Sequence, residues 1–508
     1  MASGRPDAAD AGLPVSGASR TTSSSTAPNW HFDNSYTRLP SLLFSPAVPA
    51  PVKSAMLLVL NEPLAEELGL DATALGNAAA IFGGNELPPG AEPIAQAYAG
   101  HQFGQFTNLG DGRAILLGEQ LAPDGRRFDI QLKGAGRTRY SRGGDGRAAE
   151  GPMLREYVIS EAMHALGIPT TRSLAVAATG EWVMRETPLP GAVLTRVAAS
   201  HIRVGTFQYA AAIAEPGVLA ALLAHAIERH APEAAQAGDP AVAFLEQVVE
   251  RQAALLAKWM HVGFVHGVMN TDNMTVSGET IDYGPCAFLD TYDRAAVFSS
   301  IDRQGRYAYG NQPAIAHWNL ARLAESLITL VSGGDDERAI TAVRGVLDTF
   351  PERYERHHLA GARAKLGITA PEAGDRLLFG DLLGAMAAAE ADFTTTFAGL
   401  AAIAESRSRP EASSTSPELH AWYGRWLERL SREPGSHAAS LLRRSNPVII
   451  PRNHRVEEAL AAAAAGDRGV LERLLAAVRE PYVETPTNAP YRTGPPAGCG
   501  PYRTFCGT

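Results

Sequence analysis

The stretch Phe264-Val-His-Gly-Val-Met-Asn-Thr-Asp-Asn273, followed by Ile281-Asp-Tyr-Gly284, decides the fold of this chain. It combines an Asp-Asn pair, two short apolar runs that can pair as a hairpin, and a second Asp before an aromatic residue and a glycine. A nucleotide-bound Mg²⁺ needs such hard oxygen ligands at the ends of rigid strands. The stretch therefore predicts the metal-binding end of an ATP site, although such residues can also simply cap a turn.

The spacing of this stretch can be compared with the protein-kinase pattern H-R-D-x-x-x-x-N followed by D-F-G. His266 and Asn273 stand in the register of the kinase His and Asn, and Asp282 follows at a plausible hairpin distance. Where a kinase has its catalytic Asp, this chain has Val268. Either the domain is an inactive kinase, or another group acts as the base, for which Asp272 is the candidate.

Composition and charge limit the possible functions. The chain has 508 residues, 45% of them hydrophobic, which predicts a soluble globular protein with two or three core-bearing units. There is no apolar run long enough to span a membrane and no secretory signal, so we expect a cytoplasmic bacterial protein without a membrane partner. The net charge of −9 argues against a nucleic-acid partner, because phosphate backbones attract concentrated Lys and Arg. Any bound phosphate must be held by a local cluster.

The sequence pattern divides the chain into six segments. Residues 1–28 are rich in Ala, Ser, Thr, Gly and Pro and are expected to be disordered. The other five are an N-terminal extension (29–100), a β-rich nucleotide-binding lobe (101–205), a helical lobe with the metal-binding loop (206–400), a helical C-terminal extension (401–485) and a flexible Cys-containing tail (486–508). A small sheet lobe followed by a helical lobe with a metal loop is the order of a protein kinase, an α+β fold.

A glycine-rich turn and a strand lysine predict the nucleotide-facing part of the small lobe. Leu109-Gly-Asp-Gly-Arg-Ala-Ile-Leu-Leu-Gly118 places glycines before an apolar run, so the backbone can approach a ligand closely. Such a turn alone is more often a simple hairpin turn. In Arg127-Phe-Asp-Ile-Gln-Leu-Lys133, apolar and polar residues alternate, which predicts a strand with Lys133 on its polar face, pointing away from the core.

Three further charged residues are candidates for the same site. A predicted helix that begins at Pro152 carries Glu156 in its first turn. Glu156 could pair with Lys133, as in kinases, or lie in solvent near the positive end of the helix dipole; the order of strand and helix favours the pair. Arg196 and Arg203 are candidates for the phosphate cluster, although either one alone could be an ordinary surface residue.

With these pieces in order, the chain resembles the selenoprotein O family, also called YdiU, of bacteria and mitochondria. The resemblance covers nearly everything after residue 28 and is carried, besides the metal loop, by Tyr98-Ala-Gly-His-Gln-Phe-Gly104, Gly110-Asp-Gly-Arg-Ala-Ile-Leu-Leu-Gly-Glu119, Gln131-Leu-Lys-Gly-Ala-Gly-Arg137, Met153-Leu-Arg-Glu156 and Phe505-Cys-Gly-Thr508. It implies a bilobal, protein-kinase-like (pseudokinase) fold that binds ATP in a flipped orientation. It also implies a protein adenylyltransferase, which moves AMP from ATP to Ser, Thr or Tyr hydroxyls and releases pyrophosphate, with Mg²⁺ or Mn²⁺ as cofactor.

The resemblance also implies roles for individual residues by motif match. Asp272 would be the base, Asn273 and Asp282 would bind the metal, and Glu156 would orient Lys133. The residues that would hold phosphates or line the nucleotide are Gly110, Gly112, Arg113, Lys133, Asp145, Gly146, Arg196, Arg203 and Asp282.

Rival functions stay open at this point. They are a protein uridylyltransferase using UTP and Mn²⁺, a kinase-type phosphotransferase, and a non-catalytic nucleotide-binding scaffold. Val268 speaks against the phosphotransferase, and a complete set of phosphate and metal ligands speaks against the scaffold. We expect ATP and hydroxyl-bearing proteins as partners, and a monomer.

The three cysteines suggest a redox switch. Three cysteines in so long a chain cannot form a disulfide framework, which fits a reducing compartment. Cys286 directly follows Asp282-Tyr-Gly-Pro, and Cys506 lies near the end of the Gly- and Pro-rich tail. We hypothesise that oxidation links Cys286 to Cys506, or alternatively to Cys499, and holds the tail across the cleft, which the redox-active C-terminus of the resembled family favours. The other interpretation is a small buried cysteine and a frayed tail.

Overall fold

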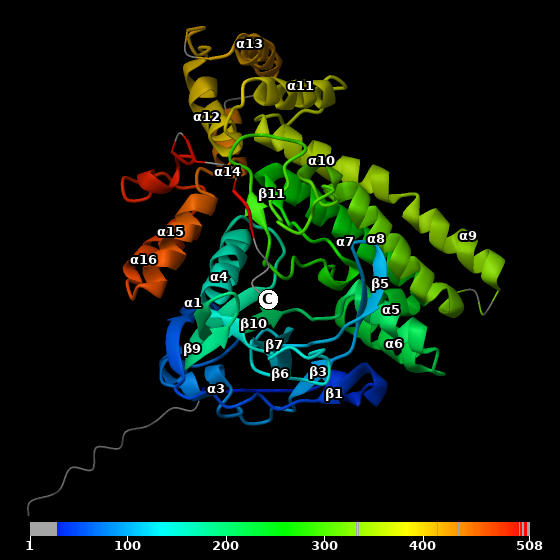
Figure 1. Ribbon diagram of the computed structural model, residues 1–508. Helices are drawn as coiled ribbons and strands as arrows, with labels where there is room; N and C mark the ends of the chain where they lie inside the picture. Colours follow the sequence, from blue (N-terminus) through cyan, green and yellow to red (C-terminus); the bar gives the residue numbers. More distant parts are fainter. Residues whose placement is uncertain are drawn as a thin grey trace, which may run out of the picture.

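The computed structural model describes residues 28–504 except 332, 334, 414, 434–436, 497, 500 and 501. This part of the chain is α+β, with a β-sheet lobe next to a larger helical region (Figure 1), as predicted. Apart from Pro28, the segment 1–28 lies outside the described residues, and so does Cys506. Within the described residues, no helix combines the length and apolarity needed to cross a membrane.

The main sheet has eight strands in the order β1-β3-β6-β7-β10-β9-β2, with β8 paired to β10, and its paired strands are antiparallel. The strands are β1 (Phe44–Pro46), β2 (Met56–Leu60), β3 (Ile94–Gln96), β6 (Ala114–Leu121), β7 (Arg127–Lys133), β8 (Ala148–Ala149), β9 (Arg172–Met184) and β10 (Pro188–Ala198). Strands β1, β2 and β3 come from the segment predicted as an extension. The boundary predicted at residue 100 therefore runs through one continuous sheet.

The α-helices of the described residues run from Glu62 to Val478. They are α1 (Glu62–Glu67), α2 (Ala72–Gly76), α3 (Ala79–Gly83), α4 (Glu150–Ala165), α5 (Val204–Ile213), α6 (Val218–His230), α7 (Pro240–Val262), α8 (Gln312–Leu327), α9 (Asp336–Leu347), α10 (Phe350–Lys365), α11 (Asp375–Ala388), α12 (Phe393–Ser406), α13 (Pro417–Ser431), α14 (Ala438–Ser445), α15 (Asn453–Ala464) and α16 (Gly469–Val478). The boundary predicted at residue 400 falls inside α12.

Helix α7 delivers the chain to the predicted metal loop. The Asp239 side chain caps its first turn by accepting from backbone N–H groups, Pro240 follows, and Gly263 ends it in the left-handed conformation (φ 71°). The next residues form β11 (Phe264–Val265), which pairs antiparallel with β12 (Ala287–Phe288). This short pair closes residues 266–286 into one loop.

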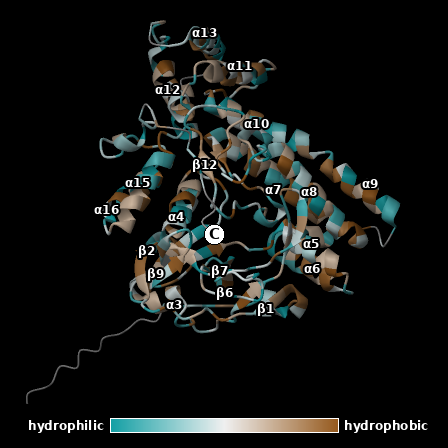
Figure 2. Cartoon of the chain, in the orientation of Figure 1, coloured by the Kyte–Doolittle hydropathy of each residue, from teal (hydrophilic) through white to brown (hydrophobic). Residues whose placement is uncertain are grey.

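Helix α4 is fixed on both sides. Met153, Leu154 and Tyr157 belong to the same apolar core cluster as the sheet residues Val176 and Leu194. Helices α15 and α16 pack against α4 from the C-terminal part of the chain (Figure 1). Outer helices such as α9 instead alternate between hydrophilic and hydrophobic residues along their length (Figure 2), as expected where one face meets solvent. Packing on both sides therefore holds α4, the helix that carries Glu156, in place.

The described end of the tail is hydrogen-bonded to the rest of the chain. The backbone N–H of Thr504 donates to the carbonyl of Phe298 (2.8 Å), and the N–H of Ser300 donates to the carbonyl of Thr504 (2.9 Å). The Thr504 hydroxyl also donates to the carbonyl of Pro285 (2.7 Å). Backbone groups that a frayed tail would leave to water find partners here.

Candidate active site

Lys133 at the end of β7 forms the predicted ion pair with Glu156 of α4. Its Nζ donates to Glu156 Oε2 at 2.6 Å and also to the carboxylate of Asp282. Lys133 lies on the polar face of β7, but this face is covered: Lys133 is only 4% exposed, and its neighbours on the same face, Asp129 and Gln131, are buried as well. Both faces of β7 are covered, and the charges on the polar face are matched by partners.

Arg196 of β10 completes a cluster of two cations and two carboxylates. Its Nη1 lies 3.3 Å from Glu156 Oε1 and 4.0 Å from Asp282 Oδ1, and its Nη2 donates to Gln131 Oε1 at 2.6 Å. Burial alone would raise the pKa of Asp282, but the positive charges of Lys133 and Arg196 hold this pKa well below its usual range. Asp282 is therefore ionised at neutral pH.

The backbone at Asp282 is itself unusual. Its φ of 66° places a non-glycine residue in the left-handed region, which costs about 1–2 kcal/mol. The Nε2 of fully buried His266 donates a 2.9 Å hydrogen bond to the carbonyl of Ile281, the residue before Asp282. Such strained residues concentrate at functional sites, where surrounding contacts hold them. The contact with His266 holds the backbone next to this carboxylate.

Asp272 and Asn273 lie on the short 3₁₀ helix η4 (Thr271–Asn273). The amide nitrogen of Asn273 donates to the carbonyl of Val268 at 3.0 Å, so its amide oxygen is the atom left for a ligand. Asp272 Oδ1 is buried and has no hydrogen-bond partner among the described residues. Burial, with a smaller contribution from the charge of Asp282, raises the pKa of Asp272 to about 6. A β-carbon at Gly100 would lie only 2.2 Å from this Oδ1, so only glycine leaves room for it.

Arg203 is the N-cap residue of α5 and carries unused hydrogen-bond donors. Its guanidinium lies 4.3 Å from the centre of the Tyr98 ring, and its Nη1 lies 3.6 Å from Asp111 Oδ1. The Nε and Nη1 atoms of Arg203 and the Nε of Arg196 are buried without a hydrogen-bond partner among the described residues. Leaving such donors unpaired is costly, so the arrangement fits an anionic oxygen ligand such as a phosphate.

Three residues that were not predicted as site residues contact the predicted arginines. Asp111 and Tyr98 contact Arg203, and Gln131 accepts from Arg196. Asp111 is 2% exposed, and its Oδ2 accepts from the backbone N–H of Gln96 (3.1 Å) and from Gln131 Nε2 (3.2 Å). The available signal was an acidic residue between two glycines, in a motif already singled out for its turn. Tyr98 likewise stands in a quoted motif, but nothing in the sequence says that its ring meets Arg203.

The predicted nucleotide glycines have a packing reason to be glycine. A β-carbon at Gly110 (φ 112°) would lie 2.4 Å from Tyr140 Cγ, and one at Gly112 would lie 2.9 Å from the Tyr140 carbonyl oxygen. A β-carbon at Gly146 (φ 70°) would lie 2.1 Å from the carbonyl oxygen of Gly136. Close packing of the two loops thus accounts for these glycines without a ligand.

Of the predicted nucleotide-binding residues, Arg113 lies near the cluster of Lys133, Glu156, Arg196 and Asp282, whereas Asp145 pairs with another residue. The positive charge of Arg113 contributes to the lowered pKa of Asp282, which puts it near the cluster. Asp145 is exposed and pairs with Arg185, with 2.9 Å between Arg185 Nη1 and Asp145 Oδ2. Asp145 is therefore bound to a different partner from the other predicted residues.

A metal at this site would depend on few protein ligands. The described residues contain no group of three or more His, Cys, Asp or Glu side chains arranged to hold a metal ion. Mg²⁺ is commonly bound by one or two protein oxygen ligands together with substrate phosphates and water. The amide oxygen of Asn273 and the ionised carboxylate of Asp282 are oxygen donors of this kind.

Two of the three cysteines are described, and both are free thiols. Cys286 is fully buried, its Sγ donates to the carbonyl of Tyr283 at 3.3 Å, and burial raises the pKa of its thiol to about 12. Cys499 is exposed. The predicted link to Cys506 cannot be placed because Cys506 lies outside the described residues, but Thr504 is bound to Pro285, the residue before Cys286.

The site combines a buried lysine, a helix glutamate and a loop carboxylate, as a kinase site does, but buried Val268 stands where a kinase has its base. A family profile described as "Protein adenylyltransferase SelO" matches residues 27–479. The chain belongs to this family and is a nucleotidyltransferase.

Similar proteins cover almost the whole chain. A "Protein nucleotidyltransferase YdiU" of Geobacillus kaustophilus (strain HTA426) is 60% identical over 484 residues, which is 94% of this chain and 99% of the relative. Proteins of the same description from Bacillus cytotoxicus (58% identity; 94% of this chain, 98% of the relative) and Syntrophotalea carbinolica (53%; 96% and 99%) are also similar. The predicted resemblance to the selenoprotein O (YdiU) family is confirmed.

Proposed function

We propose that this chain transfers AMP from ATP to Ser, Thr or Tyr hydroxyls of proteins and releases pyrophosphate, with Mg²⁺ or Mn²⁺ as cofactor. The family establishes nucleotidyl transfer; the nucleotide, the acceptor and the metal are the proposed part. The observation that carries the proposal is the set of unpaired guanidinium donors on Arg196 and Arg203, beside the paired Lys133, in a site that lacks the kinase base. These donors suit a polyphosphate, and the missing base disfavours ordinary phosphoryl transfer.

The side chains divide the work of the reaction. Asn273 and Asp282 would hold the metal, which when bound neutralises triphosphate charge. Lys133, held by Glu156, and the two arginines would bind phosphate oxygens through charge-assisted hydrogen bonds. These contacts would fix the triphosphate for attack at the α-phosphorus.

Asp272 is suited to be the base of the transfer step. Its Oδ1 has no hydrogen-bond partner among the described residues, and its pKa of about 6 leaves it mostly ionised at neutral pH while still basic enough to accept a proton. It would take the proton of the acceptor hydroxyl, whose oxygen forms a bond to the α-phosphorus. The bond from that phosphorus to the bridging oxygen breaks, and pyrophosphate leaves with its electron pair.

Intact-mass analysis of the purified protein incubated with ATP and Mg²⁺ tests this function. We expect an added AMP on the protein itself or on an added acceptor protein, and no such adduct with Asp272→Asn. An adduct with the mass of a phosphate alone would instead support the phosphotransferase. Running the same assay with UTP and Mn²⁺ decides between adenylyl and uridylyl transfer.

We also propose redox control of this activity through Cys286 and Cys506. The hydrogen bond from Thr504 to Pro285 supports this proposal, because it places Thr504, two residues before Cys506, beside the residue that precedes Cys286. A two-electron oxidant such as hydrogen peroxide would convert the two thiols to one disulfide, with Cys499 as the alternative partner. Peptide mapping of oxidised, unreduced protein should find the Cys286 bond, and a reductant should raise activity. The switch is wrong if Cys286 stays a free thiol after oxidation.

A further inference from the structure

A groove lies between the tip of the β4–β5 hairpin and the segment that leads into α8. Strands β4 (Ala99–Gln102) and β5 (Gln105–Asn108) form this hairpin. The groove has a volume of about 630 Å³ and is lined by Phe103, Gln105, Ile301, Asp302, Arg303, Gln304, Arg306, Asn311, Ala314 and Ile315. We call it the hairpin groove. None of its lining residues belongs to the cluster around Lys133.

Both walls of the hairpin groove are tied to the loop that carries Asp272. On the hairpin side, the N–H of Phe103 donates to Asn270 Oδ1 at 3.1 Å, and the N–H of His101 donates to Thr271 Oγ1 at 2.7 Å. On the other side, the Tyr307 hydroxyl donates to the same Asn270 Oδ1 at 2.6 Å. Because both walls meet at Asn270, two residues before Asp272, the groove is held in a fixed position relative to the proposed base.

The hairpin tip exposes apolar groups at some cost to the backbone. Phe103 is 38% exposed although its φ is 50°, and Gly104 follows with φ 86°. A left-handed backbone is unfavourable for a non-glycine residue. The exposed part of the Phe103 ring also contributes no hydrophobic stabilisation to the free protein. Ile301 on the opposite wall is 50% exposed. The groove therefore offers two apolar side chains that are partly exposed in the chain by itself.

The charged side chains of the groove are predominantly basic. Arg303 is exposed, and Arg306 is partly buried with its guanidinium 4.9 Å from the centre of the Trp318 ring. Arg306 Nε is buried and has no hydrogen-bond partner among the described residues. The lining carboxylate, Asp302, is 5% exposed and accepts from the N–H groups of Arg306 (2.9 Å) and Tyr307 (2.8 Å). Both oxygens of this carboxylate therefore already accept hydrogen bonds from backbone N–H groups.

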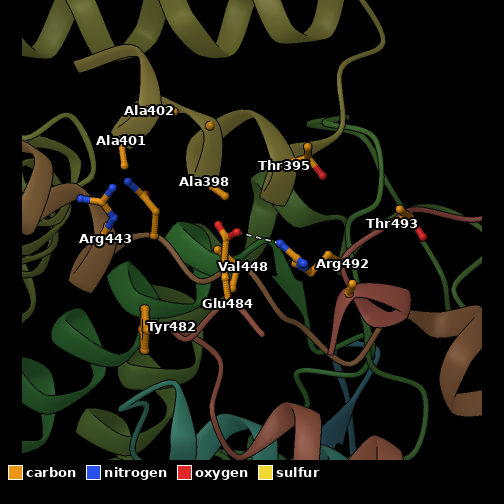
Figure 3. A pocket seen from close by; sticks show the side chains of 13 residues that line it. Thr395, Ala398, Ala401, Ala402, Arg443, Val448, Tyr482, Glu484, Arg492 and Thr493 are labelled. Atoms are coloured by element: carbon orange, nitrogen blue, oxygen red, sulfur yellow. Dashed lines mark hydrogen bonds and ion pairs between the residues drawn. The ribbon is translucent and has the colours of Figure 1, made fainter. Parts of the chain in front are cut away.

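Neither groove arginine forms an ion pair within the described part of the chain, whereas two arginines at another cavity do. The cavity of about 720 Å³ between α12, α14 and residues 482–493 shows the contrast (Figure 3). There, Arg492 pairs with Glu484 (2.7 Å), and Arg443 pairs with Glu405 (2.5 Å). Of these two cavities, the hairpin groove is the one with arginines available to a partner's carboxylates.

We propose that the hairpin groove docks the protein substrate through a segment with acidic side chains and an apolar side chain near the hydroxyl to be modified. This inference rests on the proposed function and names the acceptor's recognition features. Partner carboxylates would pair with Arg303 and Arg306, since guanidinium groups bind carboxylates in a planar, two-bonded geometry. The apolar side chain would pack on Phe103 and Ile301, next to the loop of Asp272.

Two fluorescein-labelled synthetic peptides test the docking. Each contains one Ser next to a Leu; one carries three flanking Glu residues and the other three flanking Lys residues. Fluorescence anisotropy with the full-length protein measures binding, and transfer of α-labelled AMP to the same peptides measures reaction. We expect the Glu peptide to bind at least fivefold more tightly than the Lys peptide, with a preference that weakens as salt is added.

Variants with matched controls locate the docking site. Arg303→Glu should weaken binding of the Glu peptide at least fivefold, and Phe103→Asn about tenfold; Asn tolerates the left-handed backbone, so the hairpin should keep its shape. Arg338→Glu, an exposed arginine of α9, and Leu377→Asn, an exposed residue of α11, are the controls and should leave binding unchanged. ATP binding should be the same in all four variants.

Two outcomes would overturn the docking proposal. One is equal binding of both peptides, or none; the other is that Arg303→Glu and Phe103→Asn behave like their controls. If instead the Glu peptide binds as expected but receives no label from α-labelled ATP, the groove is an acidic-peptide site and the proposed transfer to protein hydroxyls fails. Binding and transfer therefore separate the two proposals.

Discussion

The pH dependence of catalysis tests the role of Asp272 most sharply. A base must be ionised to accept a proton, so activity should be lost as pH falls through its pKa. With a pKa of about 6, Asp272 is about nine-tenths ionised at pH 7 and about one-tenth ionised at pH 5. The value of kcat/KM should therefore fall about tenfold between these two pH values. An unperturbed aspartate would be more than nine-tenths ionised at both, giving a nearly flat profile.

Initial rates of AMP transfer at low concentrations of ATP with saturating Mg²⁺ measure this profile, because kcat/KM reports the free enzyme. Asp272→Asn should lower kcat by about 10²–10⁴ and abolish the inflection, while ATP binding stays close to that of the unaltered protein. Gly100→Ala should also slow the reaction, because its β-carbon would lie 2.2 Å from Asp272 Oδ1 and displace the carboxylate.

Asp272 is not the base if kcat/KM stays flat between about pH 5 and pH 8, or if Asp272→Asn retains full turnover. An inflection near pH 6 that survives in Asp272→Asn would assign the titration to another group. Direct measurement of ATP binding at each pH is the control, because it separates loss of the base from loss of the nucleotide.

Three further substitutions test the rest of the site. Asp282→Ala removes a proposed metal ligand, so calorimetric titration should show the Kd for ATP with Mg²⁺ rising about tenfold or more; an unchanged Kd would exclude that role. Glu156→Gln should misplace Lys133 and lower transfer about 10²-fold, whereas Glu161→Gln, which breaks a buried ion pair on the same helix, should not. Arg203→Met removes charge-assisted hydrogen bonds of about 1.5–3 kcal/mol, so KM for ATP should rise about tenfold to hundredfold; normal KM would argue against phosphate binding there.

Local pattern and chain order were enough to predict much of the site. The alternation before Lys133 and the helix start before Glu156 are short-range signals, and their order along the chain suggested the pair that the structure contains. The helix start signal at Pro152 likewise placed α4, which begins at Glu150. These features depend on neighbouring residues, which a sequence shows directly.

Contacts between distant segments could not be read in this way. The partners Tyr98 and Asp111 of Arg203 lie about a hundred residues from it along the chain, and no periodicity links them. Alternation showed that Lys133 shares the polar face of its strand, but not that this face is covered. The docking of Thr504 on Pro285 joins residues 219 positions apart. Tertiary packing decides each of these.

The central claim is that the α-phosphate of ATP, and not the γ-phosphate, goes to a protein hydroxyl. Parallel reactions with α-labelled and γ-labelled ATP, followed by separation of protein from nucleotide, measure this directly. We predict label in protein only from α-labelled ATP, with pyrophosphate as the other product and no transfer by Asp272→Asn. Label in protein from γ-labelled ATP, with ADP as the other product, would contradict the account.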